Sequence, residues 1–179
     1  MLFRSKVSKL FVLAPSYVRD MPATAPTALP NGAMGVQSLA SFRQNWERQV
    51  GCPDQVDPQA SEAVWKAMIA SDPVAAKWGP GVRRAPNVNS YGFNKATVAG
   101  MRTPFAMATG PHDKQVAAER VYALYEDLGA KDKVLVDIAC TSHNAMWERN
   151  HLLLFRSTVE WLRDGQVNGA RTGIVKLGY

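Results

Sequence analysis

The sequence contains few cysteines and no long apolar run, and both absences narrow the classes of protein to which it can belong. Only two residues are cysteine, Cys52 and Cys140, and they lie too far apart in the sequence for a disulfide framework or a zinc site. No apolar run approaches the eighteen or so residues of a membrane-spanning helix. The apolar run 10–14 is also shorter than the roughly 7 to 15 residues in the core of a secretory signal. We therefore expect a cytoplasmic protein that does not enter a membrane.

No nucleic-acid-binding motif accompanies the positive charge of the chain. The formal net charge is +6, and four positive residues precede the first acidic one: Arg4, Lys6, Lys9 and Arg19. A basic amino end can bind nucleic acid or an anionic surface, but such binding normally comes with a recognisable motif. We interpret these residues as the solvated approach to a strand rather than as a binding arm. The expected partners therefore include neither nucleic acid nor a membrane.

The composition is that of an ordinary globular domain. The chain has 179 residues, of which 46% are hydrophobic and 20% charged, enough for one domain with a substantial core. Three short apolar segments predict buried strands at residues 7–14, 103–110 and 134–138. Helical periodicity predicts helices at the following residues: 36–50, 57–73, 115–129 and 147–165. Residues 72–102 are rich in glycine and proline and predict irregular covering structure.

The final predicted helix has an apolar stripe. Leu152, Phe155, Val159 and Leu162 recur at helical spacing, and Gly165 ends the pattern. Trp147 and Glu148 stand at its beginning, where the Glu148 carboxylate would favour the positive end of the helix dipole.

Two titratable residues follow two of the predicted strands. Asp113 lies three residues beyond the segment 103–110, and His143 lies five residues beyond the segment 134–138. The alternation of strands and helices favours a parallel sheet, in which functional groups gather beyond the carboxyl ends of the strands. A carboxylate beside an imidazole fixes its tautomer and stabilises its protonated form. We therefore expect Asp113 and His143 to lie within hydrogen-bonding distance if the two strands are neighbours.

These segments resemble part of a known family. The motifs "GPHDKQV" and "CTSHNAMWE", each between a strand and a helix, resemble the last two β/α units of the α/β-hydrolase fold, in which the catalytic acid precedes the histidine. Upstream, "SKVSKLFVLAPSYVRD" resembles the strand and loop after the nucleophile helix. The resemblance covers nearly the whole chain but only the second half of the family's fold.

The resemblance implies a fold and a chemistry. The fold would be α/β, a partial hydrolase sheet of three mainly parallel strands with flanking helices. Residues 1–29 would supply the first strand and loop, 30–102 a helical cap insertion and 103–179 the carboxy-terminal core. Asp113 and His143 would be the catalytic acid–base pair acting on a small ester-like substrate, with no metal or organic cofactor.

The chain departs from the family at the nucleophile, because no Gly-x-Ser-x-Gly occurs anywhere in it. Ser90 in "NSYGF" lacks the preceding glycine and a preceding strand. Ser142 is expected to bond the turn or cap the next helix. Cys140 could be an activated thiol near the histidine, although a small buried cysteine is the commoner case.

Two functional hypotheses therefore remain. One is an ester hydrolase whose nucleophile comes from elsewhere or is replaced by water. The other is an inactive truncated homologue or interaction module. With the amino-terminal half of the fold missing, the strand 7–14 becomes a sheet edge, which predicts a homodimer or pairing with a complementary amino-terminal half.

The remaining aromatic and histidine residues have less specific interpretations. Trp46, Trp65 and Trp78 would either line an apolar pocket or anchor the core of the cap. His112, beside Asp113, could compete as a base but is expected to face solvent. His151 is expected to be a surface or packing residue within the last helix.

Overall fold

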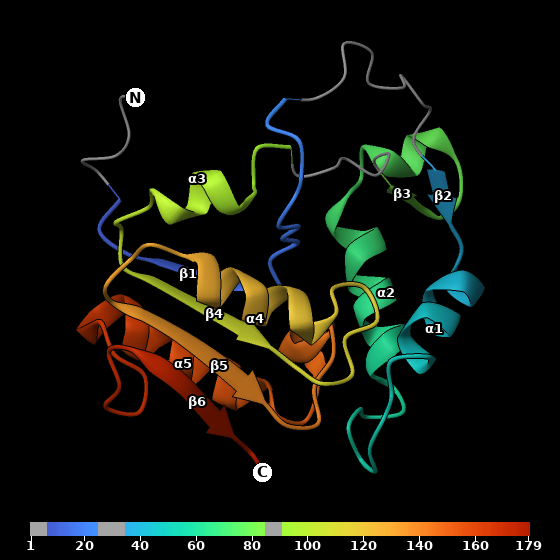
Figure 1. Cartoon of the computed structure of the whole chain (residues 1–179). Coiled ribbons are helices and arrows are strands. Elements are labelled where there is room, and N and C mark those ends of the chain that lie inside the picture. The colour runs from blue at the N-terminus through green and yellow to red at the C-terminus, as the bar shows by residue number, and fades with distance from the viewer. Residues whose placement is uncertain (1–6, 25–34, 85–90) are drawn as a thin grey trace.

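A four-stranded parallel sheet forms the centre of the molecule. The computed structural model describes residues 7–24, 35–84 and 91–179 (Figure 1). The strands lie in the order β1-β4-β5-β6, and all three pairings are parallel. Their bounds are β1 Leu10–Leu13, β4 Phe105–Thr109, β5 Lys133–Ile138 and β6 Gly173–Leu177. The predicted α/β class with a parallel sheet is confirmed, but the predicted number of three strands is wrong.

The fourth strand, β6, escaped prediction because no continuous apolar run marks it. Side chains along β6 alternate between partly buried and exposed positions, and Lys176 interrupts its short apolar run. By contrast, every residue of β4 is buried, and so is every residue of β5 after Lys133. Continuous apolar runs of this kind are typical of strands covered on both faces.

Helices cover both faces of the sheet. In Figure 1, α3 (Lys95–Ala99) and α4 (Ala118–Asp127) lie above the sheet and α5 (His151–Asp164) lies below it. The core on the α4 side includes Met107, Leu124 and Leu135, and the core on the α5 side includes Val136 and Trp161.

The last helix begins at His151 and not at Trp147, where the sequence predicted its start. Trp147 ends the short helix η2 (Ala145–Trp147), and Glu148 follows it.

A smaller layer stands beside the sheet, to the right in Figure 1. Its elements are β2 Gly35–Gln37, α1 Leu39–Glu47, α2 Ala60–Ser71, η1 Ala75–Trp78 and β3 Val82–Arg84, with β2 and β3 antiparallel. Phe42 of α1 contacts the rings of Trp46 and Trp65, and Trp46 contacts Trp147 of η2. Trp46 and Trp65 are therefore anchors of this layer, and Trp46 also ties it to the sheet domain.

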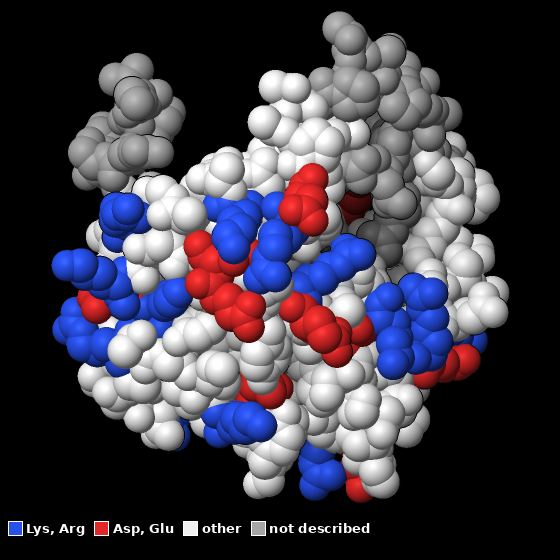
Figure 2. Space-filling view, in the orientation of Figure 1, with Lys and Arg blue, Asp and Glu red and all other residues white. Residues whose placement is uncertain are grey.

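Basic residues near the amino end are engaged within the molecule. Lys9 Nζ donates to the carbonyl oxygens of Leu162 and Arg163 at the end of α5. Arg19 pairs with Glu126 and Asp127 of α4. Figure 2 shows positive and negative side chains interspersed over the face seen in Figure 1. Among the residues that the structure describes, no helix is long and apolar enough to span a membrane.

Candidate functional site

The loops that follow β4 and β5 are in close contact at the carboxyl edge of the sheet. The two strands are parallel neighbours, with Thr109 opposite Asp137. A Cβ atom on Gly110 would overlap the hydroxyl and carbonyl oxygens of Thr141, so this approach requires glycine. The backbone N–H of His112 donates to the carbonyl oxygen of Thr141 at 3.1 Å. The contact between the loops brings the residues that follow each strand to one place.

Asp113 and His143 meet there, as the sequence predicts. Asp113 Oδ2 lies 2.9 Å from His143 Nδ1. The other carboxylate oxygen, Oδ1, accepts the backbone N–H groups of Gln115 and Val116, each at 2.8 Å. The side chain of Asp113 is 1% exposed, whereas that of His143 is 35% exposed. The carboxylate is therefore fixed and shielded, while the imidazole reaches the surface.

The contact determines which ring nitrogen of His143 is free to react. Asp113 Oδ2 accepts a hydrogen bond, so in the neutral imidazole Nδ1 carries the proton and Nε2 keeps its lone pair. Among the described residues, Nε2 has no hydrogen-bond partner. An imidazole oriented in this way can accept a proton at Nε2 while the carboxylate stabilises the resulting positive charge.

A buried carboxylate supports the loop that carries His143. Glu148 is 1% exposed, and it accepts hydrogen bonds from the backbone N–H of Ser142 at 2.7 Å and from its hydroxyl at 2.5 Å. Gln55 Nε2 donates to the same carboxylate at 3.0 Å. The sequence predicts that Glu148 favours the positive end of a helix dipole, but its carboxylate instead accepts hydrogen bonds from the turn and from Gln55.

Gln49, from the segment after α1, bridges the two loops. Its Oε1 lies 3.4 Å from the backbone nitrogens of both Lys114 and His143. Its backbone oxygen accepts from Gln55 Nε2 at 3.1 Å, and the residue as a whole is 2% exposed. Gln49 and Gln55 were not singled out from the sequence, because an isolated glutamine gives no sign of its distant partners.

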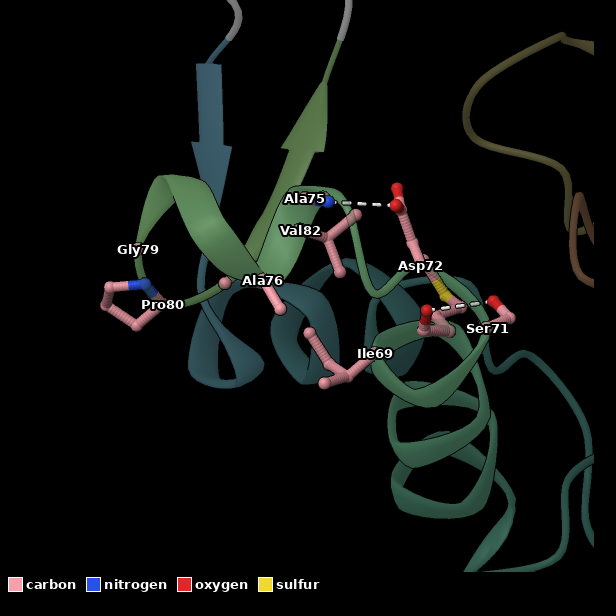
Figure 3. Close-up of a pocket in the computed structure, with 10 residues that line it drawn as sticks. Ile69, Ser71, Asp72, Ala75, Ala76, Gly79, Pro80 and Val82 are labelled. Atoms are coloured by element: carbon pink, nitrogen blue, oxygen red, sulfur yellow. Dashed lines mark hydrogen bonds between the residues drawn. The ribbon is translucent and has the colours of Figure 1, made fainter.

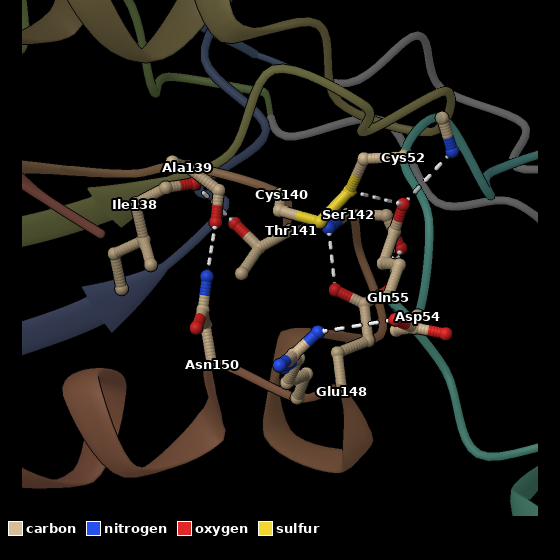
Figure 4. The surroundings of a disulfide bond; sticks show 12 residues. Cys52, Asp54, Gln55, Ile138, Ala139, Cys140, Thr141, Ser142, Glu148 and Asn150 are labelled. Atoms are coloured by element: carbon tan, nitrogen blue, oxygen red, sulfur yellow. Dashed lines mark hydrogen bonds and ion pairs between the residues drawn. A yellow bond between two sulfur atoms is a disulfide. The ribbon is translucent and has the colours of Figure 1, made fainter. Parts of the chain in front are cut away.

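A disulfide joins the same segments. Cys52 and Cys140 are bonded, with their Cα atoms 5.9 Å apart and their positions separated by 88 in the sequence (Figure 4). The spacing of the two cysteines in the sequence did not predict this bond, because sequence separation says nothing of the distance after folding. Cys140 turns the chain sharply after β5 with a positive φ of 55°. The bond excludes Cys140 as a free thiol nucleophile.

The other candidate residues do not supply a nucleophile. The Ser142 hydroxyl donates to Glu148 and accepts the backbone N–H of Asn144, so its predicted role in the turn is confirmed. Ser90 lies outside the described residues. His112 is half-buried, and its ring packs against the backbone of Gly51, which corrects the prediction that it faces solvent. His151 is a packing residue, with its ring against Phe155.

One cavity of the smaller layer lies away from the carboxylate–imidazole pair. It has a volume of about 480 Å³ and is lined by residues of α2, η1 and β3, including Ile69, Ala76 and Val82 (Figure 3). Asp72 is its acidic residue, and its Oδ1 accepts the backbone N–H of Ala75 at 2.9 Å. Neither Asp113 nor His143 lines this cavity, and nor do the tryptophans that were candidates for an apolar pocket.

Comparisons of the chain with protein-family models, with curated proteins and with solved structures found no match. Within the described part of the chain, no group of three or more His, Cys, Asp or Glu side chains is placed to hold a metal ion.

Proposed function

We propose that Asp113 and His143 form the acid–base pair of a hydrolase related to the α/β-hydrolase family, acting on ester-type bonds in a small molecule. The observation that carries this proposal is the 2.9 Å contact between a shielded carboxylate and an imidazole whose second nitrogen is open. Chain order gives further support, because the acid precedes the histidine and both follow neighbouring parallel strands. This is the arrangement that the resemblance implies.

In the proposed reaction, His143 moves one proton in each direction. As the oxygen of a hydroxyl or water bonds the ester carbonyl carbon, its proton passes to His143 Nε2. When the bond from that carbon to the leaving oxygen breaks, the same proton passes to the departing alkoxide. Asp113 remains ionised throughout and stabilises the imidazolium at Nδ1. The nucleophile is water or a hydroxyl group supplied from outside the described residues.

The alternative is an inactive homologue or interaction module. Three facts favour it: the sequence has no Gly-x-Ser-x-Gly, the Cys140 sulfur is in a disulfide, and the Ser142 hydroxyl is bonded to Glu148. A histidine base without a positioned nucleophile would leave little activity. The two hypotheses therefore predict different rates of ester hydrolysis.

Hydrolysis of an activated aryl ester by the purified chain tests the proposal. General-base catalysis is typically worth about 10²–10⁴-fold, so His143→Ala should lose most of the parent rate above buffer. The matched control is His112→Ala, which removes a histidine from the neighbouring loop and should leave the rate unchanged. A parent rate no higher than buffer would favour the inactive module. Equal rates for the parent and His143→Ala would place the activity at another site.

We also propose that the protein resides in an oxidising compartment. The sequence predicts a cytoplasmic location partly because its two cysteines are too few and too far apart for a disulfide framework. Because disulfides persist mainly in oxidising compartments, the Cys52–Cys140 bond favours such a compartment instead.

A further inference from the structure

One face of α5 is apolar and exposed to solvent. Along it, Leu152 is 67% exposed, Phe155 46%, Val159 55% and Leu162 50%. We call these four residues the α5 stripe. A second face of the helix is also apolar and is buried against the sheet through Leu154 and Trp161. A helix that covers a sheet normally turns polar residues to solvent, and contiguous exposed apolar surface is typical of an interaction site.

The stripe continues onto the first strand of the sheet. A groove of about 540 Å³ lies between β1 and α5, with Phe11 and Leu13 on the strand side and Phe155 and Val159 on the helix side. Met146 and Trp147 line it as well and are 38% and 43% exposed. Strand edge and helix stripe therefore form one surface.

Strand β1 is the last strand on this side of the sheet, and within the described part of the chain no strand pairs with its outer edge. The N–H groups of Leu10 and Ala14 donate inward, to the carbonyl oxygens of Pro104 and Ala108. Since successive residues of a strand alternate in direction, the N–H and C=O groups of Phe11 and Leu13 point outward.

Lys9, which directly precedes β1, is engaged within the chain. Charged side chains on an edge strand normally prevent it from pairing with another chain. The Lys9 ammonium, however, is bonded to the last carbonyl groups of α5. Lys6 lies outside the described residues.

We propose that this surface binds a second copy of the chain, through antiparallel pairing of the two β1 strands about a two-fold axis. An axis perpendicular to the sheet keeps both α5 helices on the same face and brings their stripes together. With Val12 at the axis, Phe11 lies opposite Leu13 of the partner subunit, and their outward N–H and C=O groups form hydrogen-bonded pairs. The two four-stranded sheets then join into one.

Charge supports a second copy as the occupant. The charged residues along the stripe form pairs within each chain, Arg156 with Glu160 and Arg163 with Asp164. Two such surfaces therefore meet without a net repulsion of like charge. A single symmetry operation also buries both the free strand edge and the stripe, as expected for an isologous interface.

Sedimentation of the purified chain at micromolar concentration tests this proposal. The parent should be a dimer. Val159→Lys should weaken dimerisation at least about tenfold, since an unpaired charge in an apolar interface costs more than the ~1.4 kcal/mol that corresponds to that factor. Because Val159 is half exposed, the variant should keep the parent's circular dichroism and melting temperature. The control is Ile174→Lys, at a similarly exposed residue on the opposite edge strand β6, which should remain a dimer.

Cross-linking tests the register. Val12→Cys places two thiols across the proposed axis, and mild oxidation should yield a covalent dimer, whereas Ile174→Cys should not. A parent chain that is monomeric, as it would be if a separate amino-terminal half were the natural partner, would overturn the proposal. A dimer unaffected by Val159→Lys would do so equally.

Discussion

His143 is held at two points, by Asp113 at its ring and by Gln49 near its backbone N–H. Neither contact accounts for the shape of the turn itself, which depends on Glu148. This carboxylate accepts two hydrogen bonds from Ser142 and one from Gln55 in a region closed to solvent. At the residue scale, the candidate site therefore depends on a buried acid that takes no part in the proposed chemistry.

Glu148→Ala should destabilise the fold by about 3 kcal/mol. The variant leaves the Ser142 N–H and the Gln55 amide without this acceptor, and a buried donor without a partner costs roughly 1–3 kcal/mol. Urea unfolding should show a lower midpoint with an unchanged slope. The control is Glu47→Ala, which removes an exposed carboxylate and should change stability by no more than about 0.5 kcal/mol. Equal effects of the two substitutions would contradict the role assigned to Glu148.

The Asp127 cluster should make stability depend on pH in the acid range. Burial alone would raise the pKa of Asp127, but hydrogen bonds from Arg19, Tyr17 and Lys95 outweigh it and hold the pKa below its ordinary value. The folded chain therefore binds this proton less tightly than the unfolded chain. The stabilisation is present above the ordinary aspartate pKa of about 3.9 and is lost as the pH falls through the lowered folded value.

Asp127→Asn should reduce stability at neutral pH and flatten its loss below about pH 4. Urea unfolding at a series of pH values measures this, with Asp20→Asn, at an exposed carboxylate, as the control. In the alkaline range Tyr17 gives the opposite dependence, so that stability falls as the pH rises. Burial and the bond to Asp127 raise the pKa of Tyr17 to about 12, so its contribution is lost as the pH rises above about 10. A pH profile of Asp127→Asn identical to that of the parent would contradict the acid-range prediction.

At the scale of elements, the disulfide connects the segment between α1 and α2 to the turn that follows β5. The bonded residues are 88 positions apart in the sequence, and for a loop of this length the chain-entropy model gives a stabilisation of about 4.6 kcal/mol. The double variant Cys52→Ser/Cys140→Ser should therefore unfold at a lower denaturant concentration than the parent. Reductant should shift the parent to the midpoint of the double variant and leave the double variant itself unchanged. A parent that does not respond to reductant would contradict a structural role for the bond.

In the last helix, periodicity predicted which residues share a face but not which face is buried. Spacing predicted a helix with one apolar stripe, and the stripe exists, but it faces solvent while a second apolar face packs on the sheet. Leu154 and Trp161 occupy that second face. Periodicity identifies which residues share a face but not which face meets the core, since that depends on where the chain arrives at the sheet.

At the scale of the whole molecule, the two parts of the chain should differ in local stability. Strands β4 and β5 are buried along almost their whole length, whereas α2 contains no fully buried residue. Amides with few buried contacts around them open at lower free energy. Hydrogen exchange should therefore be slowest in β4 and β5 and much faster in α2. Exchange in α2 as slow as in β5 would show that the smaller layer opens only with the whole fold.

The sequence by itself determined three of the four strands of the sheet (β1, β4 and β5), two of the three helices that cover it (α4 and α5) and the pairing of Asp113 with His143. Each rests on local patterns: continuous apolar runs for buried strands, helical spacing for the covering helices, and the position of a titratable residue just beyond a strand. Parallel neighbouring strands place their carboxyl ends together, so these local patterns were sufficient to predict the 2.9 Å contact.

Only the tertiary structure decided the rest. The edge strand β6 alternates between partly buried and exposed residues, so no continuous apolar run marks it. The Cys52–Cys140 bond and the contacts of Gln49, Gln55 and Glu148 join segments far apart in the chain. Such contacts depend on where the folded chain brings distant residues, and local propensity and spacing carry no information about that distance. The residues that support His143 could therefore be identified only from the folded structure, in which the smaller layer packs against the sheet.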